Sequence, residues 1–143
     1  MKTRILGLAA LALALALPLG VRAQGGAPPF AGGKKITTDE ALKEAPKDDP
    51  SLAPLDKAFY AAAAALKKSP KDAKVKKAYV DATFKYGQAC EYNAAKLSNP
   101  VKYRAALALY RKALAVDPKH APSLLEKKKI DDIYAGMPGG IPK

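Results

Sequence analysis

One segment, from Tyr103 to Pro118, limits what this chain can fold into more than any other stretch. Its apolar residues recur at helical spacing and its basic residues fall mostly on the other side, as in a helix buried along one face. The apolar set is Leu107, Tyr110, Ala113 and Leu114. Pro100 suits the first position of a helix, and Asp117 leaves the helical region because a proline follows it. The sequence therefore predicts a helix over residues 100–116.

The same spacing of small residues and proline occurs earlier in the chain. Ala106, Ala113 and Pro118 are separated by seven and then five residues, and Ala58, Ala65 and Pro70 repeat both intervals. Alanines two helical turns apart on one face let a neighbouring helix approach closely. We therefore expect two helices of the same kind, each followed by a turn and a new helix.

These two signatures resemble the second helix of a tetratricopeptide repeat, and the later one ends in that family's Asp-Pro turn. The resemblance covers about residues 55–134. The family period is about 34 residues, whereas 48 residues separate Pro70 from Pro118, so we expect an overlong first helix between the signatures. The resemblance implies an all-α fold of stacked antiparallel hairpins that binds a protein or peptide. Its four main helices are expected near residues 53–68, 73–97, 100–116 and 122–135.

In this family the inner groove is built from the first helix of each pair, which here is the helix at 73–97. The candidate groove residues on it are Lys77, Tyr79, Asp81, Lys85 and Gln88. Tyrosines on this helix are expected to pack the helix interfaces, and the alternative is that some line the groove. Cys90 lies near the same apolar stripe, so we expect it to be buried, with an intermolecular disulfide as the alternative.

The first 23 residues have the features of a secretory signal peptide, with Lys2 and Arg4 before an apolar run and Val21-Arg22-Ala23 at the cleavage site. The competing interpretation is a membrane anchor, but the run from Ile5 to Leu17 is shorter than the ~20 residues that span a bilayer. We therefore expect an exported bacterial protein, periplasmic or secreted, that begins at Gln24 and carries no transmembrane segment after cleavage.

The mature chain is predicted to have one helical domain, residues 51–135, between two segments without periodicity. Residues 24–50 are rich in Gly, Pro and Lys and are expected to form a flexible arm. Within that arm Thr37 and Glu40 have capping-box spacing, which predicts a short helix that Pro46 ends. Residues 136–143 are expected to be a disordered tail. The helix at 122–135 should cap the stack with its apolar side, Leu124, Leu125, Ile130, Ile133 and Tyr134.

Charge offers a second functional hypothesis. Removal of the signal segment leaves 22 basic against 13 acidic side chains, a net charge of +9, which attracts a protein to anionic lipid headgroups or polymers. The candidate basic patch is Lys67, Lys68, Lys71, Lys74, Lys127, Lys128 and Lys129. The alternative is that these lysines only solvate helix faces. Nucleic acid is not expected as a partner, since no exposed aromatic residues are interleaved with the lysines.

Catalytic and metal-binding motifs are missing from the sequence. His120 is the single histidine and Cys90 the single cysteine, and zinc sites need several such ligands. His120 is expected to cap the following helix or to be exposed, and Asp131-Asp132 is read as solvated surface. We therefore expect no enzyme activity, cofactor or metal. The first hypothesis is an exported non-catalytic scaffold for a protein or peptide, and the alternative is an electrostatic binder of anionic polymer or membrane.

Overall fold

Five α-helices and two shorter helical turns make up residues 36–143, the part of the chain that this computed structural model describes. The helices are α1 (Thr38–Asp48), α2 (Ala53–Lys68), α3 (Ala73–Gln88), α4 (Asn99–Val116) and α5 (Ala121–Ala135). A 3-10 turn, Pro50–Leu52, precedes α2, and a π-helical turn, Ala89–Asn93, extends α3. The predicted signal segment and residues 24–35 lie outside the described residues.

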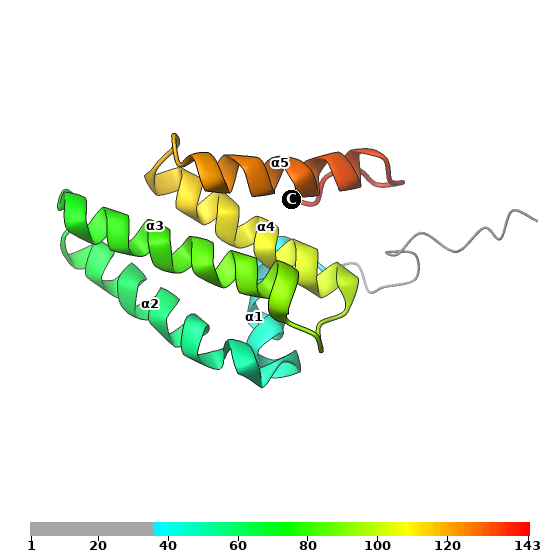
Figure 1. The fold of residues 1–143 in the computed structure, drawn as a ribbon, viewed down its shortest axis with the longest axis horizontal. Coiled ribbons are helices and arrows are strands. Elements are labelled where there is room, and N and C mark those ends of the chain that lie inside the picture. Colours follow the sequence, from blue (N-terminus) through cyan, green and yellow to red (C-terminus); the bar gives the residue numbers. More distant parts are fainter. Residues whose placement is uncertain (1–35) are drawn as a thin grey trace, which may run out of the picture.

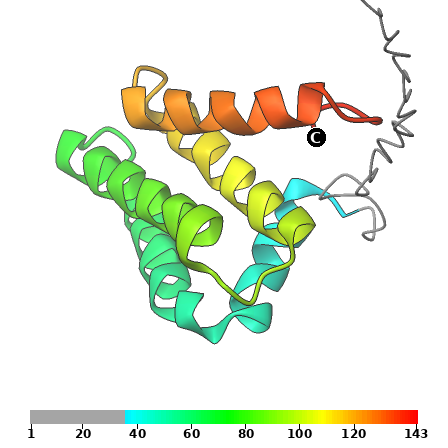
Figure 2. The same cartoon turned by 45° about the vertical axis from the view of Figure 1, so that its right-hand side comes forward.

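Helix α4 is the centre of the core, and α1, α3 and α5 all pack against it (Figures 1 and 2). Its buried residues are Val101, Ala105, Ala106, Leu107, Ala108, Leu109, Tyr110 and Ala113. The helix predicted at 100–116 is therefore confirmed. Ala106 and Ala113 are both fully buried, as expected for positions where neighbouring helices approach closely.

The two alanine signatures differ in burial. Ala58 and Ala65 on α2 are exposed, although they repeat the spacing of the buried pair on α4. Helix α2 packs mainly on α3, and Phe59 is its one buried residue. The repeated spacing therefore predicted the helix but not the face that it buries, since α2 lies at the outside of the structure with a single main neighbour.

Helix α3 is shorter than expected, because the α-helix ends at Gln88 and the π-helical turn that follows it ends at Asn93. The backbone N–H of Ala94 donates to the carbonyl of Ala89 at 2.9 Å, which is the wider ring of a π-helical turn. Ala94 then adopts φ −78° and ψ 86°, outside the helical region. The prediction of one helix over 73–97 is wrong for its last residues.

The expectation of a flexible arm is wrong for residues 36–50, which form α1 and pack on α4. The predicted capping box is present: the N–H of Glu40 donates to Thr37 Oγ1 at 3.2 Å, and the N–H of Thr37 donates to Glu40 Oε2 at 2.7 Å. Pro46 does not end the helix, since it lies in the last turn, where it removes only one backbone hydrogen bond. Ala41, Leu42 and Ala45 are buried.

The C-terminal segment is also part of the folded structure rather than a free tail. The backbone N–H and the hydroxyl of Thr38 both donate to the carbonyl of Lys143, at 3.3 and 3.0 Å. Met137 is half-buried against the core. The two ends of the described chain therefore meet beside α1.

Helix α5 covers α4 with fewer apolar residues than expected. Ile130 and Tyr134 are buried, whereas Leu124, Leu125 and Ile133 are exposed. The prediction that all five form the packing side is therefore wrong for three of them. Ser123 and Glu126 occupy the buried positions instead, where Ser123 contacts His120 and Glu126 accepts a hydrogen bond from Tyr92.

Candidate functional site

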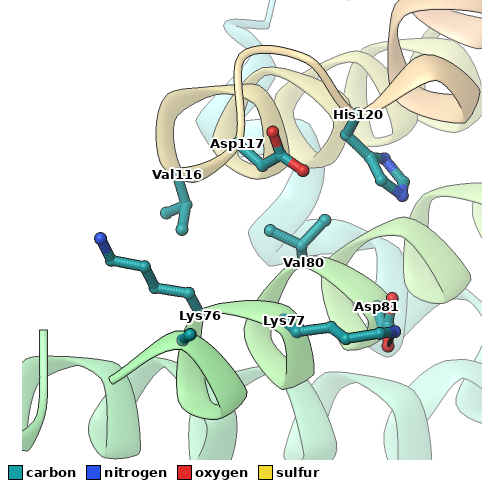
Figure 3. Close-up of a pocket in the computed structure, with 8 residues that line it drawn as sticks. Lys76, Lys77, Val80, Asp81, Val116, Asp117 and His120 are labelled. Atoms are coloured by element: carbon teal, nitrogen blue, oxygen red, sulfur yellow. Dashed lines mark hydrogen bonds and ion pairs between the residues drawn. The ribbon is translucent and has the colours of Figure 1, made fainter. Parts of the chain in front are cut away.

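A hollow of about 470 Å³ lies between the first half of α3 and the α4–α5 turn (Figure 3). Its lining residues are Ala73, Lys76, Lys77, Val80, Asp81, Val116, Asp117 and His120. The five α3 residues fall at the i, i+3, i+4, i+7 and i+8 positions of one helix face. The opposite wall comes from the end of α4 and the start of α5.

The hollow lies beside the first half of α3, whereas α3 and α4 pack tightly at Gly87, near the end of α3. A Cβ atom at Gly87 would stand 2.6 Å from Tyr110 Cε1, so only glycine permits the two helices to come this close. The ring of Phe84, one turn earlier on α3, meets Tyr110 at 5.8 Å and His120 at 5.3 Å between ring centroids. Beyond Phe84, toward the start of α3, the hollow begins.

The interior of the hollow is apolar, and the residues around it are polar. Val80 is buried and Val116 is half-buried, and Figure 3 shows their side chains facing one another across the hollow. Val116 is the last residue of α4, which stops there because Asp117 precedes Pro118. Asp117 accepts a hydrogen bond from the N–H of Lys119 at 3.1 Å, which holds the turn in shape.

His120 forms a fixed part of the wall. Its Nδ1 accepts from the N–H of Ser123 at 3.3 Å and lies 2.8 Å from Ser123 Oγ, so the ring caps α5. The edge contact with Phe84 holds the other side of the ring. Capping is thus confirmed for His120, and the orientation of its ring is set by α5 and α3 together.

Charge at the rim is partly neutralised. Lys77 Nζ lies 2.6 Å from Asp81 Oδ2, an exposed i,i+4 pair along α3. Lys76 is exposed and has no carboxylate within ion-pair distance among residues 36–143. The hollow therefore offers an apolar floor, one paired set of charges, one unpaired ammonium and the carboxylate of Asp117.

Two of the five candidate groove residues line this hollow, Lys77 and Asp81. Tyr79 instead is buried, with its ring 5.9 Å from that of Phe59 between centroids, so it packs α3 on α2. Lys85 is exposed and Gln88 half-buried, and neither lines the hollow. The opposite wall was not predicted, because the candidate groove residues all lie on one helix. The Asp-Pro turn that ends α4 was the available signal for that wall.

The candidate basic patch separates into two clusters with different electrostatics. On α5, Lys127 pairs with Asp131, Lys128 lies 2.7 Å from Asp132 and Lys129 lies 2.9 Å from Glu126. By contrast, Lys67, Lys68, Lys71 and Lys74 surround the α2–α3 turn and are all exposed. No carboxylate among residues 36–143 is within ion-pair distance of these four. The α5 lysines are thus locally neutralised, whereas the four at the turn are not.

A partly buried polar cluster joins the π-helical turn to α4 and α5. Tyr110 Oη donates to Glu91 Oε2 and Tyr92 Oη donates to Glu126 Oε2, both at 2.7 Å. Lys129 completes the cluster through its pair with Glu126. Burial raises the pKa of Glu91, while the hydrogen bond from Tyr110 opposes that shift. The donors and acceptors match one another, so the cluster acts as a clasp between these elements.

Cys90 is fully buried, as predicted. Burial raises the pKa of its thiol to about 12, so the nucleophilic thiolate is scarcely populated near neutral pH. Its neighbour Tyr86 is also fully buried and donates to Asp56 Oδ1 at 3.2 Å. The hydrogen bond of Tyr86 to Asp56 ties α3 to α2.

Within residues 36–143 no three His, Cys, Asp or Glu side chains lie close enough together to hold a metal ion. None of the helices in this part of the chain combines the length and apolar character needed to cross a bilayer. No protein-family model, curated protein or solved structure matches the chain.

Proposed function

We propose that this protein is a small non-catalytic scaffold that holds an extended segment of another protein in the hollow between α3 and the α4–α5 turn. The hollow itself carries this proposal, because it combines an apolar floor with polar groups along its edges. That combination suits a peptide, whose side chain contacts the floor while its backbone groups find hydrogen-bonding partners at the rim.

The groups around the hollow favour binding over chemistry. Lys77 and Asp81 occupy each other at 2.6 Å, and one ring nitrogen of His120 is used in capping α5. Asp117 holds the turn that forms the opposite wall. Each of these polar groups therefore has a structural role, and each can still make a further hydrogen bond to a bound backbone.

The scaffold role agrees with what the tetratricopeptide resemblance implies. Export to the periplasm or beyond is part of the proposal, because it follows from the sequence of residues 1–23. The partner would then be another envelope or secreted protein.

The proposal can be tested with a large side chain that fills the hollow without disturbing the core. Ala73 lines the hollow and is exposed, and Ala78 is an exposed alanine on the same helix outside the hollow. Peptides would first be selected from a random displayed library with the wild-type protein. Their affinities for Ala73→Trp and for the control Ala78→Trp would then be compared by fluorescence anisotropy.

We expect Ala73→Trp to weaken the selected peptides by about tenfold or more, equivalent to about 1.4 kcal/mol, and Ala78→Trp to leave them unchanged. Amide chemical shifts of residues 73–81 and 116–120 should move on binding. A library that yields no binder, or binders equally insensitive to both variants, would refute a peptide site in this hollow.

A further inference from the structure

Six lysines gather at the α2–α3 turn, at one end of the molecule. They are Lys67, Lys68, Lys71, Lys74, Lys76 and Lys77, and the single acidic residue among them is Asp72. Figures 1 and 2 both place this turn at the left end of the molecule. The turn is thus a projecting tip with a high density of positive charge.

The acidic residue at the tip is already used by the fold. Asp72 Oδ1 accepts hydrogen bonds from the N–H groups of Lys74 and Val75, at 2.7 and 3.1 Å, as the N-cap of α3. Only Lys77 has a carboxylate partner, Asp81. Five of the six ammonium groups therefore stand without a carboxylate partner among residues 36–143.

The two helices compared with the tip carry less positive charge than the tip does. Helix α1 carries Asp39, Glu40, Glu44 and Asp48 against two lysines, and Figure 2 shows it on the far side of the molecule from the tip. The outer face of α2 from Ala58 to Leu66 has no charged residue. An anionic surface that approaches the tip consequently meets no carboxylate along α2 between Ala58 and Leu66.

We infer that the α2–α3 turn is a docking surface for an anionic phospholipid bilayer, formed chiefly by Lys67, Lys68, Lys71 and Lys74, which do not line the peptide site. The lysines surround a convex turn rather than line a groove, so they fit a broad, flat array of charges better than a single polymer strand. The turn, Ser69-Pro70, has no large apolar side chain to insert. The contact is therefore electrostatic adsorption at the headgroups, with the acidic α1 directed away from the surface.

The strength of such a contact can be estimated. Each lysine within a Debye length of an anionic bilayer, about 8 Å at physiological salt, raises partitioning about fivefold. Three lysines at the tip then account for roughly a hundredfold. The same three charges on α5 contribute much less, since Lys127, Lys128 and Lys129 each have a carboxylate partner.

This difference provides a matched pair of variants for cosedimentation with vesicles of phosphatidylglycerol and phosphatidylcholine. The tip variant is Lys67→Gln/Lys68→Gln/Lys71→Gln, and the control is Lys127→Gln/Lys128→Gln/Lys129→Gln. Both lose three positive charges and have the same net charge. The wild type and both variants would be compared as the proteins purified after export from the producing cells. Circular dichroism would verify that each is folded.

We expect the tip variant to lose roughly a hundredfold in binding to the anionic vesicles, and the control only a few-fold. Binding of the wild type should vanish in concentrated salt and should be undetectable with pure phosphatidylcholine. Equal losses in both variants would overturn the inference, because binding would then follow net charge alone. Complete displacement by soluble polyphosphate at equal phosphate concentration would also overturn it and assign the tip to a soluble polymer. Neither result would affect the test of the peptide site, which uses Ala73→Trp.

Discussion

At the scale of single residues, Gly87 is the position where the backbone of α3 lies directly against the ring of Tyr110 on α4. Glycine in a helix usually costs stability, and its replacement by alanine usually gains about 0.5–1 kcal/mol. At Gly87 the sign should reverse, because the added Cβ would overlap the ring of Tyr110, which is fully buried and cannot move aside.

We predict that Gly87→Ala lowers the free energy of unfolding by about 1–3 kcal/mol, as overpacking does elsewhere. Gly136→Ala is the control, since a Cβ there meets only the carbonyl of Ile133 at 3.8 Å. It should leave stability unchanged or slightly increased. Chemical denaturation of both variants gives the measurement, and a Gly87→Ala protein as stable as the wild type would mean that α3 and α4 do not cross so tightly.

Glu91 allows a pH-dependent prediction. Its pKa is raised above the usual value of 4.5, so the folded state binds the proton more tightly than the unfolded state does. Stability associated with this group therefore falls as the pH rises from 4.5 through the raised pKa. Glu91→Gln removes this contribution while its amide oxygen can still accept from Tyr110.

The difference in unfolding free energy, Glu91→Gln minus wild type, should be most positive near neutral pH and should shrink as the pH falls toward 4.5. Urea titrations at several pH values would measure it. Glu126 serves as the contrast, because its pKa is lowered by Lys129 and Tyr92 despite burial. Its substitution by Gln should change stability in the opposite direction with pH. A pH-independent difference for Glu91→Gln would contradict the burial of that carboxyl group.

At the scale of helices, the sequence indicated where elements begin more reliably than how they pack. The segment from Ala53 to Lys68 was predicted to the residue, because Ser69-Pro70 follows it. The end of α3 was missed, since no glycine or proline marks residues 89–97 and the π-helical turn depends on contacts such as that of Glu91 with Tyr110. Helix α1 was predicted from its cap, but its packing on α4 was not, because its buried apolar surface comes from only three residues, Ala41, Leu42 and Ala45.

The packing of α1 leads to a prediction for Leu42, which is 4% exposed. Leu42→Ala should lower the free energy of unfolding by about 2–5 kcal/mol, the range for a buried leucine. Lys43→Ala is the neighbouring control, since Lys43 is exposed, and should change stability by less than about 0.5 kcal/mol. Thermal melts that do not distinguish the two variants would show that residues 36–50 behave as the flexible arm expected from composition.

The candidate site was only half predictable for a related reason. Lys77 and Asp81 could be placed on one face of α3 from their spacing alone. Val116, Asp117 and His120 come from a turn that is 35 or more residues away in sequence. Their position opposite α3 depends on the Gly87 crossing and on the capping of α5 by His120, and neither contact can be read from a periodic pattern.

At the scale of the whole molecule, α4 connects two regions of different character. The clasp of Glu91, Tyr110 and Glu126 joins the π-helical turn to α4 and α5. The hollow lies where α4 ends at Val116, and it shares Lys76 and Lys77 with the lysine-rich tip. The charges at the tip repel one another, so they weaken the fold slightly. Their effect on stability and their effect on membrane docking should therefore be separable by substitution.

Lys74 and Lys67 separate these effects because they sit at opposite helix ends. Lys74 is in the first turn of α3, where the helix dipole disfavours a positive charge, and Lys67 is in the last turn of α2, where the dipole favours one. We predict that Lys74→Glu raises the free energy of unfolding by about 0.3–1 kcal/mol at low salt and that Lys67→Glu lowers it by a similar amount.

Both substitutions change the net charge equally, so both should weaken adsorption to anionic vesicles to a similar extent. Chemical denaturation and vesicle cosedimentation of the two variants would measure the two effects separately. If adsorption instead followed stability, rising with Lys74→Glu and falling with Lys67→Glu, the lysines of the tip would act through the fold and not through direct contact with the bilayer.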